Sequence, residues 1–396
     1  MRVTAIVLAT ITLAGCSGGG GSSSSSTSTT QTSSATTQSS SVGPSMANTT
    51  ISGSVTLLTS VPTAATGFTS SGDPAVDSLV FVNYQRAQVG MPAIVQNAAL
   101  ATVATNHSVY LFDNTEIGHY ETAGRLGYTG NSPNDRITAV YSANATGEIL
   151  IAYQGIAALP NSYQPIESLF EAPFHRGVAL FDYAVGGVGY KQSGDTTKIT
   201  SLTMDFAGQQ NALGSSQMIA YPYNGQTNVE TSWYASESPS PFEANPSYDN
   251  TVVGYPILLT GGIGATLTVS SFTLRTAAGV SVACQEMDES VDSEAAGMAT
   301  CTPYAQLTPS TSYIATAVGT MTKDGMTQNF NLQWEFTTAS SVTVPMDSPS
   351  RLSAAATLSA VASQQGTSSA SSGSNTQVST QAKSIALPSP QRHFSQ

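Results

Sequence analysis

The chain has 396 residues and a formal net charge of −12, with only 12 lysine and arginine residues. So few basic side chains exclude binding to nucleic acid or to anionic lipid through a basic patch. Only 9% of the residues are charged, and serine, threonine, asparagine and glutamine supply the polarity, as is common in exported proteins. Two low-complexity ends leave enough length for two domains of ordinary size.

The first 15 residues have the pattern of a signal peptide. Arg2 precedes a short apolar run, which is too short to span a bilayer but suits a signal-peptide core. The run ends in Leu13-Ala14-Gly15-Cys16, which resembles the lipobox of bacterial lipoproteins. That resemblance implies cleavage before Cys16, lipidation of Cys16 and membrane attachment in the bacterial cell envelope, at the outer membrane or the extracellular face. The alternative is an ordinary signal peptide in which Cys16 is incidental.

Serine-rich, low-complexity sequence fills 16–64 and 341–396. Such sequence buries too little apolar surface to offset its conformational entropy. We therefore expect a disordered linker at 16–64 and a disordered tail at 341–396. His393 lies in that tail and is excluded as a site residue.

The segment 65–210 is predicted to be the first domain, of the α+β class. Apolar spacing predicts a helix from Asp77 to near Gly90 and a second from about Asn97 to Asp113. Two β-rich runs, 183–190 and 199–206, flank a turn and predict a late hairpin. Helices followed by strands indicate a layered domain.

This segment resembles the CAP family of cysteine-rich secretory proteins, antigen 5 and plant pathogenesis-related proteins. The family fold is a three-layer α-β-α sandwich. The residues that carry the resemblance are Asn83, Arg86, Gly90, Ile94, Asn97, Leu100, Ala104, His107, Gly118-His119, Arg136, Gly147-Glu148, Pro173, His175-Arg176 and Gly187-Val188-Gly189.

The resemblance implies a central cleft that holds His119, Glu148 and His175, with Glu167 or Glu171 as a further acid. Two neutral imidazoles beside a carboxylate can hold Zn²⁺, with His119 and His175 as the metal ligands. The same three groups can instead act as catalytic acid and base. The structural alternative is that these histidines are satisfied polar groups that orient loops.

Structural roles are predicted for two other residues of this segment, His107 and Arg176. His107 is predicted to form a hydrogen bond from a helix face, and Arg176 to fix a loop or form a salt bridge.

Three functions follow from the resemblance. The first is a cell-envelope protein whose cleft binds a small apolar ligand or a divalent metal, since family members include sterol and fatty-acid binders. The second is a hydrolase of envelope polymers or peptides, in which His119, Glu148 and His175 are catalytic. The third is a surface interaction module without cleft chemistry. We expect binding rather than enzymatic activity.

The segment 220–340 is predicted to be an all-β sandwich, because short β-rich runs alternate with turn residues. It resembles bacterial immunoglobulin-like or fibronectin-like modules. If Cys16 is acylated, Cys284 and Cys301 remain as a pair, and an exported protein would join them in a disulfide. The predicted strands are 255–259, 265–269, 271–275, 280–284, 311–318 and 332–337.

Two features of this segment have alternative interpretations. The loop between the cysteines is acidic and predicts either a calcium site or, more simply, a solvated hairpin. Trp233 and Tyr234 could stack on a sugar or pack in a core. The acidic residues of the loop are Glu286, Asp288, Glu289, Asp292 and Glu294.

Overall fold

The computed structural model describes residues 49–50, 54–58, 68–290, 296–347 and 394–395. The predicted signal peptide, Cys16 and most of the predicted linker and tail lie outside the described residues. No helix in the described ranges is long and apolar enough to cross a membrane. The helices are α1 Pro74–Gln88, α2 Ala98–Asn114, α3 Pro133–Thr138, α4 Gln164–Glu171 and α5 Pro173–Leu180, with a short 3-10 helix at Pro246–Tyr248.

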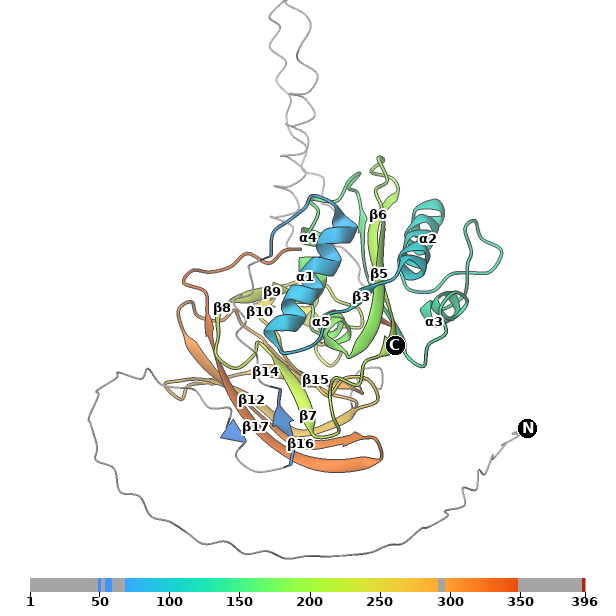
Figure 1. Ribbon diagram of the computed structural model, residues 1–396. Coiled ribbons are helices and arrows are strands. Elements are labelled where there is room, and N and C mark those ends of the chain that lie inside the picture. The colour runs from blue at the N-terminus through green and yellow to red at the C-terminus, as the bar shows by residue number, and fades with distance from the viewer. Residues whose placement is uncertain (1–48, 51–53, 59–67, 291–295, 348–393, 396) are drawn as a thin grey trace, which may run out of the picture. The chain divides into compact units, whose positions relative to one another are not determined.

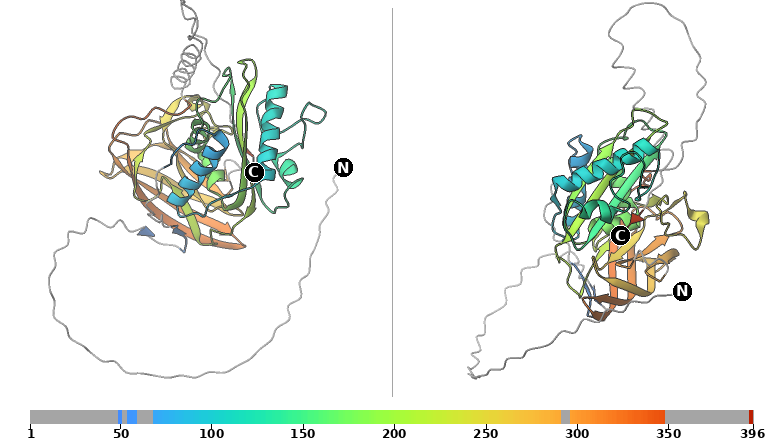
Figure 2. Two further views of the ribbon diagram at one scale, coloured as in Figure 1. Left: turned by 45° about the horizontal axis from the view of Figure 1, so that its top comes forward. Right: turned by 90° about the vertical axis from the view of Figure 1, so that its right-hand side faces the viewer.

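A mixed sheet, here called the first sheet, lies between helices and has the strand order β18-β4-β6-β5-β3. Its strands are antiparallel except where β3 runs parallel to β5. Figure 1 shows α1 on one side of β5 and β6 and α2 on the other, and Figure 2 shows the same order from another direction. The strands are β3 Val95–Gln96, β4 Thr146–Gln154, β5 Tyr183–Lys191, β6 Ile199–Gln209 and β18 Phe394–Ser395.

Strand β4 shows how the sequence produces this layering, because successive side chains in a strand point to opposite faces. Ile149 and Ile151 join the large core that includes residues of α1, α4 and α5. Leu150 and Ala152 pack with residues of α2 on the opposite face. The described residues therefore confirm the predicted α-β-α sandwich.

The two predicted N-terminal helices are also confirmed. The side chain of Asp73 accepts hydrogen bonds at the start of α1, and that of Asn97 does so at the start of α2, which satisfies N–H groups that have no partner within the helix. Helix α2 then lies very close to β5. A Cβ atom added at Gly187 or Gly189 would lie 2.1 Å from a backbone nitrogen of α2. Only glycine permits this approach.

The second segment contains three further sheets within the described residues: β1-β17-β16-β12-β13 with β8 beside β17, β14-β15-β11-β7-β2, and the pair β10-β9. Strands β12, β16 and β17 are long and lie side by side with antiparallel pairing (Figure 1). The strands are β1 Thr49–Thr50, β2 Thr56–Leu57, β7 Gln217–Tyr221, β8 Gln226–Val229, β9 Ser232–Tyr234, β10 Val252–Gly254, β11 Ile257–Thr260, β12 Thr266–Thr276, β13 Ser281–Val282, β14 Cys284–Met287, β15 Met298–Pro303, β16 Ser312–Lys323 and β17 Met326–Thr338.

Two strand predictions need correction. The runs 265–269 and 271–275 are one strand, β12, whose pairing with β16 shifts at a bulge between Val269 and Ser271. The run 280–284 is divided between β13, which pairs with β12, and β14, which pairs with β15. The disulfide Cys284–Cys301 is confirmed and joins β14 to β15.

The hydrophobic core continues from the first segment into the second. Gly177 of α5 lies against β15, and a Cβ atom added there would lie 2.6 Å from the sulfur of Met298. The ends contribute as well. Val55, within the predicted linker, is buried, and β2 pairs with β7. Asp347, within the predicted tail, accepts a hydrogen bond from Ser168 of α4. The ordered fold therefore extends beyond the boundaries predicted at 65 and 340.

Candidate functional site

His119 and Glu148 form a buried pair near the start of β4. Oε1 of Glu148 lies 2.7 Å from Nδ1 of His119. Arg136 of α3 donates to Oε2 of Glu148 at 2.7 Å and to the carbonyl oxygen of His119 at 2.9 Å. The guanidinium therefore fixes the imidazole and the carboxylate relative to each other.

The surroundings set the charge of both groups. Burial alone would raise the pKa of Glu148, but the Arg136 guanidinium and the neighbouring His107 and His119 lower it below its usual range. Burial lowers the pKa of His119 to about 4, and the contact with Glu148 offsets this only in part. At neutral pH Glu148 is therefore ionised and His119 is a neutral imidazole.

A second carboxyl group lies opposite Glu148. Asp205 of β6 is the cross-strand partner of Glu148 and is fully buried. Burial and the negative charge of Glu148 raise the pKa of Asp205 well above its usual range. Asp205 is therefore protonated beside the ionised Glu148.

His107 has the structural role that the sequence predicted. Its Nδ1 lies 3.0 Å from Oε1 of Glu121, and its Nε2 lies 3.0 Å from the carbonyl oxygen of Gly118. Burial opposes ionisation of Glu121, but the hydrogen bonds with His107 and the backbone of Thr129 lower its pKa. His107 thus holds the loop that carries His119.

His175 lies on α5 and is held by a residue of the second segment. Its Nδ1 is 2.5 Å from Oε1 of Glu237, and the same oxygen accepts from the backbone nitrogen of His175 at 2.8 Å. His175 is near enough to His119 to lower the pKa of that imidazole. His119 therefore contacts Glu148 directly, and His175 lies within electrostatic range of His119.

These three residues are closed to solvent. His119, Glu148 and His175 are each at most 1% exposed, so a ligand enters only if part of the chain moves aside. Among the residues that the structure describes, no group of three or more histidine, cysteine, aspartate or glutamate side chains is arranged to hold a metal. Each of the two predicted metal ligands, however, directs Nδ1 at a carboxylate, as metal-binding histidines commonly do.

The candidates for a further cleft acid lie elsewhere. Glu167 and Glu171 are on α4 and line a different cavity. Asp205 and Glu237 are the additional acids near the histidines, and sequence analysis missed both. The sequence did indicate Asp205, because an acidic residue within a predicted strand is unusual. It gave no indication of Glu237, which lies in another segment.

Arg176 fixes loops, as predicted, but through backbone carbonyl groups rather than a salt bridge. Its guanidinium carbon lies 4.8 Å from the ring centroid of Tyr221 and 4.6 Å from that of Tyr255. Its hydrogen bonds go to the carbonyl oxygens of Phe170, Pro256 and Glu171.

The acidic hairpin favours the structural interpretation over a calcium site. Glu286 accepts from the backbone nitrogen of Phe272, and Asp288 accepts from that of Val269. These carboxylates therefore satisfy N–H groups of β12 near its bulge. Asp292 and Glu294 lie outside the described residues.

Trp233 and Tyr234 pack in the core. Trp233 is fully buried and Tyr234 is 6% exposed, which leaves no surface on which a sugar could stack.

Comparison with known proteins assigns the first segment. Residues 79–206 match the model of the family described as "CAP: Cysteine-rich secretory protein family". These residues form a CAP domain. They include the buried pair His119–Glu148, the acid Asp205 and His175.

Two solved structures are similar to parts of the chain. One is an extracellular protein with an SCP domain from Bacillus anthracis, at 19% identity and a TM-score of 0.28, and the match covers 34% of this chain and 40% of that one. The other is an outer surface protein from Borrelia burgdorferi, at 20% identity and a TM-score of 0.27, covering 33% of this chain and 88% of that one. No curated protein matches the chain.

Proposed function

We propose that this chain is a cell-envelope binding protein whose CAP domain binds a divalent metal ion through His119 and His175. The observation that carries the proposal is the pair of histidine–carboxylate contacts, His119 with Glu148 and His175 with Glu237. A carboxylate at Nδ1 fixes the tautomer in which Nε2 carries the lone pair that a metal needs. The lowered pKa of His119 keeps that imidazole unprotonated at neutral pH.

The surrounding side chains favour a metal over a small apolar ligand. Arg136, Asp205 and Glu148 are all buried beside His119, and apolar ligands select sites lined mainly by hydrophobic groups. Zn²⁺ suits imidazole ligands and, when bound, supplies a Lewis acid. In this arrangement Glu148 and Glu237 orient the two imidazoles, and Arg136 fixes Glu148.

Isothermal titration of the full chain with Zn²⁺ tests the proposal. We expect His119→Ala and His175→Ala each to weaken binding by at least about tenfold, as the loss of one ligand predicts. His393→Ala is the matched control, because it removes a histidine outside the described residues. Zn²⁺ affinity unchanged in both site variants, or lost equally in the control, would contradict a site at these histidines. Circular dichroism confirms that each variant is folded.

A hydrolase of envelope polymers or peptides is a second candidate, and the Glu148–Asp205 pair favours it. One carboxyl group is ionised and its neighbour is protonated, which is the division of charge that acid–base catalysis uses. Screening on peptidoglycan and casein tests it. Equal turnover by the wild type and Glu148→Gln would exclude these residues as catalysts.

The location in the envelope is a separate part of the proposal. The disulfide Cys284–Cys301 supports an oxidising compartment outside the cytosol, and Cys16 is the proposed lipid anchor. Fractionation of expressing cells should find the wild type in the membrane fraction and Cys16→Ala released from it. An unchanged membrane fraction would show that Cys16 is not the anchor.

A further inference from the structure

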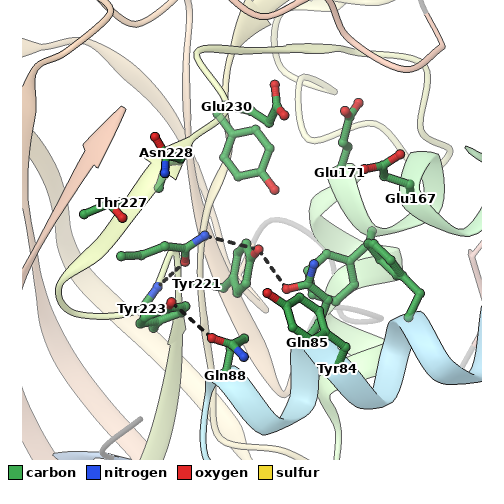
Figure 3. A pocket seen from close by; sticks show the side chains of 15 residues that line it. Tyr84, Gln85, Gln88, Glu167, Glu171, Tyr221, Tyr223, Thr227, Asn228 and Glu230 are labelled. Atoms are coloured by element: carbon green, nitrogen blue, oxygen red, sulfur yellow. Dashed lines mark hydrogen bonds between the residues drawn. The ribbon is translucent and has the colours of Figure 1, made fainter. Parts of the chain in front are cut away.

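A cavity of about 220 Å³ lies between α1, α4 and β8. Its lining residues include none of the histidine and carboxylate cluster around His119. Figure 3 shows residues of α1 and α4 and of the β7–β8 region facing the same space. The cavity is therefore a separate site, formed jointly by the CAP domain and the second segment.

Tyrosine and glutamine side chains form a connected wall of this cavity. The hydroxyl of Tyr221 donates to Oε1 of Gln85 at 3.2 Å, and that of Tyr223 donates to Oε1 of Gln88 at 3.3 Å. Gln226 donates to the hydroxyl oxygen of Tyr221 at 3.3 Å. Because Gln85 and Gln88 accept through their oxygens, their NH₂ groups remain as donors for a ligand.

Arg176 holds Tyr221 and Tyr255, two of the lining tyrosines, in place. Arg176 lies against the rings of Tyr221 and Tyr255, and its hydrogen bonds end on backbone carbonyl oxygens. Both rings are only 4% exposed. Tyr84 and Tyr223 are half-buried and lie close enough for Tyr84 to raise the pKa of Tyr223, so these two rings provide the accessible aromatic surface.

The charge of the lining restricts the ligand. The acidic side chains that line the cavity are Glu167, Glu171 and Glu230, and lysine, arginine and histidine are absent from its lining in the described residues. A lining that contains three glutamates and, among the described residues, no basic side chain disfavours phosphate and carboxylate ligands. An organic cation is the competing ligand for this lining, and displacement by choline tests for it.

We propose that this cavity binds one ring of an uncharged saccharide. Amide donors, tyrosine hydroxyls and the carboxylate of Glu230 match a ligand that both donates and accepts hydrogen bonds, and the rings of Tyr84 and Tyr223 match the apolar face of a pyranose. The volume lies below the roughly 300–1,000 Å³ of sites for drug-sized ligands, which limits the bound part to about one sugar ring.

Titration calorimetry on the full chain tests this inference with N-acetylglucosamine, its β-1,4-linked tetramer and glucose. We expect Tyr84→Ala and Gln88→Leu to weaken saccharide binding by about tenfold or more, a loss equivalent to about 1.4 kcal/mol. Tyr120→Ala is the matched control, since Tyr120 is 61% exposed and lies outside the cavity. Tighter binding of the tetramer than of the single sugar would identify a polymer as the source of the ring.

Three results would overturn the inference: no heat with any of the sugars, binding unchanged in both cavity variants, or displacement of the sugar by choline. The last result would assign the cavity to an organic cation. Melting temperatures of all variants separate loss of the site from loss of the fold. Zn²⁺ titration of the same variants distinguishes this cavity from the histidine site, because Tyr84→Ala should leave Zn²⁺ affinity unchanged.

Discussion

His175 and Glu237 lie 62 residues apart in the sequence and form a buried contact of 2.5 Å between Nδ1 and Oε1. The same carboxylate accepts from the backbone nitrogens of His175 and Phe174 at the start of α5. One side chain of the second segment thus both positions an imidazole of the CAP domain and satisfies two N–H groups of a helix.

Substitution of Glu237 should therefore destabilise the protein. We expect Glu237→Gln to lower the free energy of unfolding by about 2 to 3 kcal/mol, because hydrogen bonds to a charged acceptor are replaced by neutral ones in a buried place. Urea denaturation measures the change. Glu243→Gln is the control, because Glu243 is exposed. Its free energy of unfolding should stay within about 0.5 kcal/mol of the wild type. A loss below that level in Glu237→Gln would argue against the contact.

The Asp205–Glu148 pair predicts a stability change that depends on pH. Because folding raises the pKa of Asp205, the native state holds a proton that the unfolded chain releases above its ordinary value of 3.8. The stability that Asp205 contributes is fully present below pH 3.8, and it decreases as the pH rises towards the pKa of Asp205 in the folded state. Asp205→Asn keeps the size and shape of this buried side chain but removes its titrating proton.

We therefore expect Asp205→Asn to stabilise the protein at pH 7 and to have little effect below about pH 4. Urea denaturation across this range measures both values. Asp113→Asn is the control, as it replaces a half-buried aspartate. Equal effects of Asp205→Asn at both ends of the range would show that Asp205 is not protonated in the folded state.

The neutral state of His119 predicts a second dependence on pH. Its pKa falls from 6.5 to about 4 on folding, so between these values the unfolded chain binds a proton that the native state does not. The resulting stability is complete above pH 6.5 and is lost as the pH falls, by about 3 kcal/mol in total. His119→Gln should flatten this slope. Nuclear magnetic resonance should find the ring signals of His119 unshifted down to pH 5, and titration near pH 6.5 would contradict the burial of this imidazole.

The close approach of α2 to β5 predicts a large effect at Gly189. A Cβ atom there would lie 2.1 Å from the nitrogen and 2.5 Å from the Cα of Thr105, and backbone atoms cannot yield without moving the helix. We expect Gly189→Ala to cost about 3 kcal/mol or more in thermal or urea unfolding. Gly214→Ala, where the nearest atom is a side-chain oxygen at 3.4 Å, should change stability little. Similar small losses in both variants would contradict the packing of α2 on β5.

Local signals in the sequence were sufficient for the two N-terminal helices of the CAP domain, α1 and α2. Asp73 and Asn97 precede α1 and α2 as N-caps, and Gly90 adopts a φ of +79° just after α1. These are short-range effects that a sequence displays directly. The family resemblance then located His119 and Glu148, whose contact the structure contains.

Contacts between distant segments were not predictable in the same way. The bulge after Val269 joins two predicted strands into β12 because the partner β16 continues past it, and strand pairing of this kind depends on tertiary context. Glu237 gave no local indication of its contact with His175. The burial of His119, Glu148 and His175 was not predicted either, because the solvent exposure of a side chain depends on all the residues that pack around it.

The close contact of α5 with β15 at Gly177 has a consequence for thermal unfolding. Because α5 rests directly on Met298, separating the CAP domain from the β-rich segment would expose an apolar surface that neither part covers alone. We expect calorimetry to record one cooperative transition rather than two, with a calorimetric enthalpy equal to the van't Hoff value. Natural selection on the stability of either segment would then act on both. A destabilising substitution in the β-rich segment would lower the fraction of molecules in which the histidine site is folded.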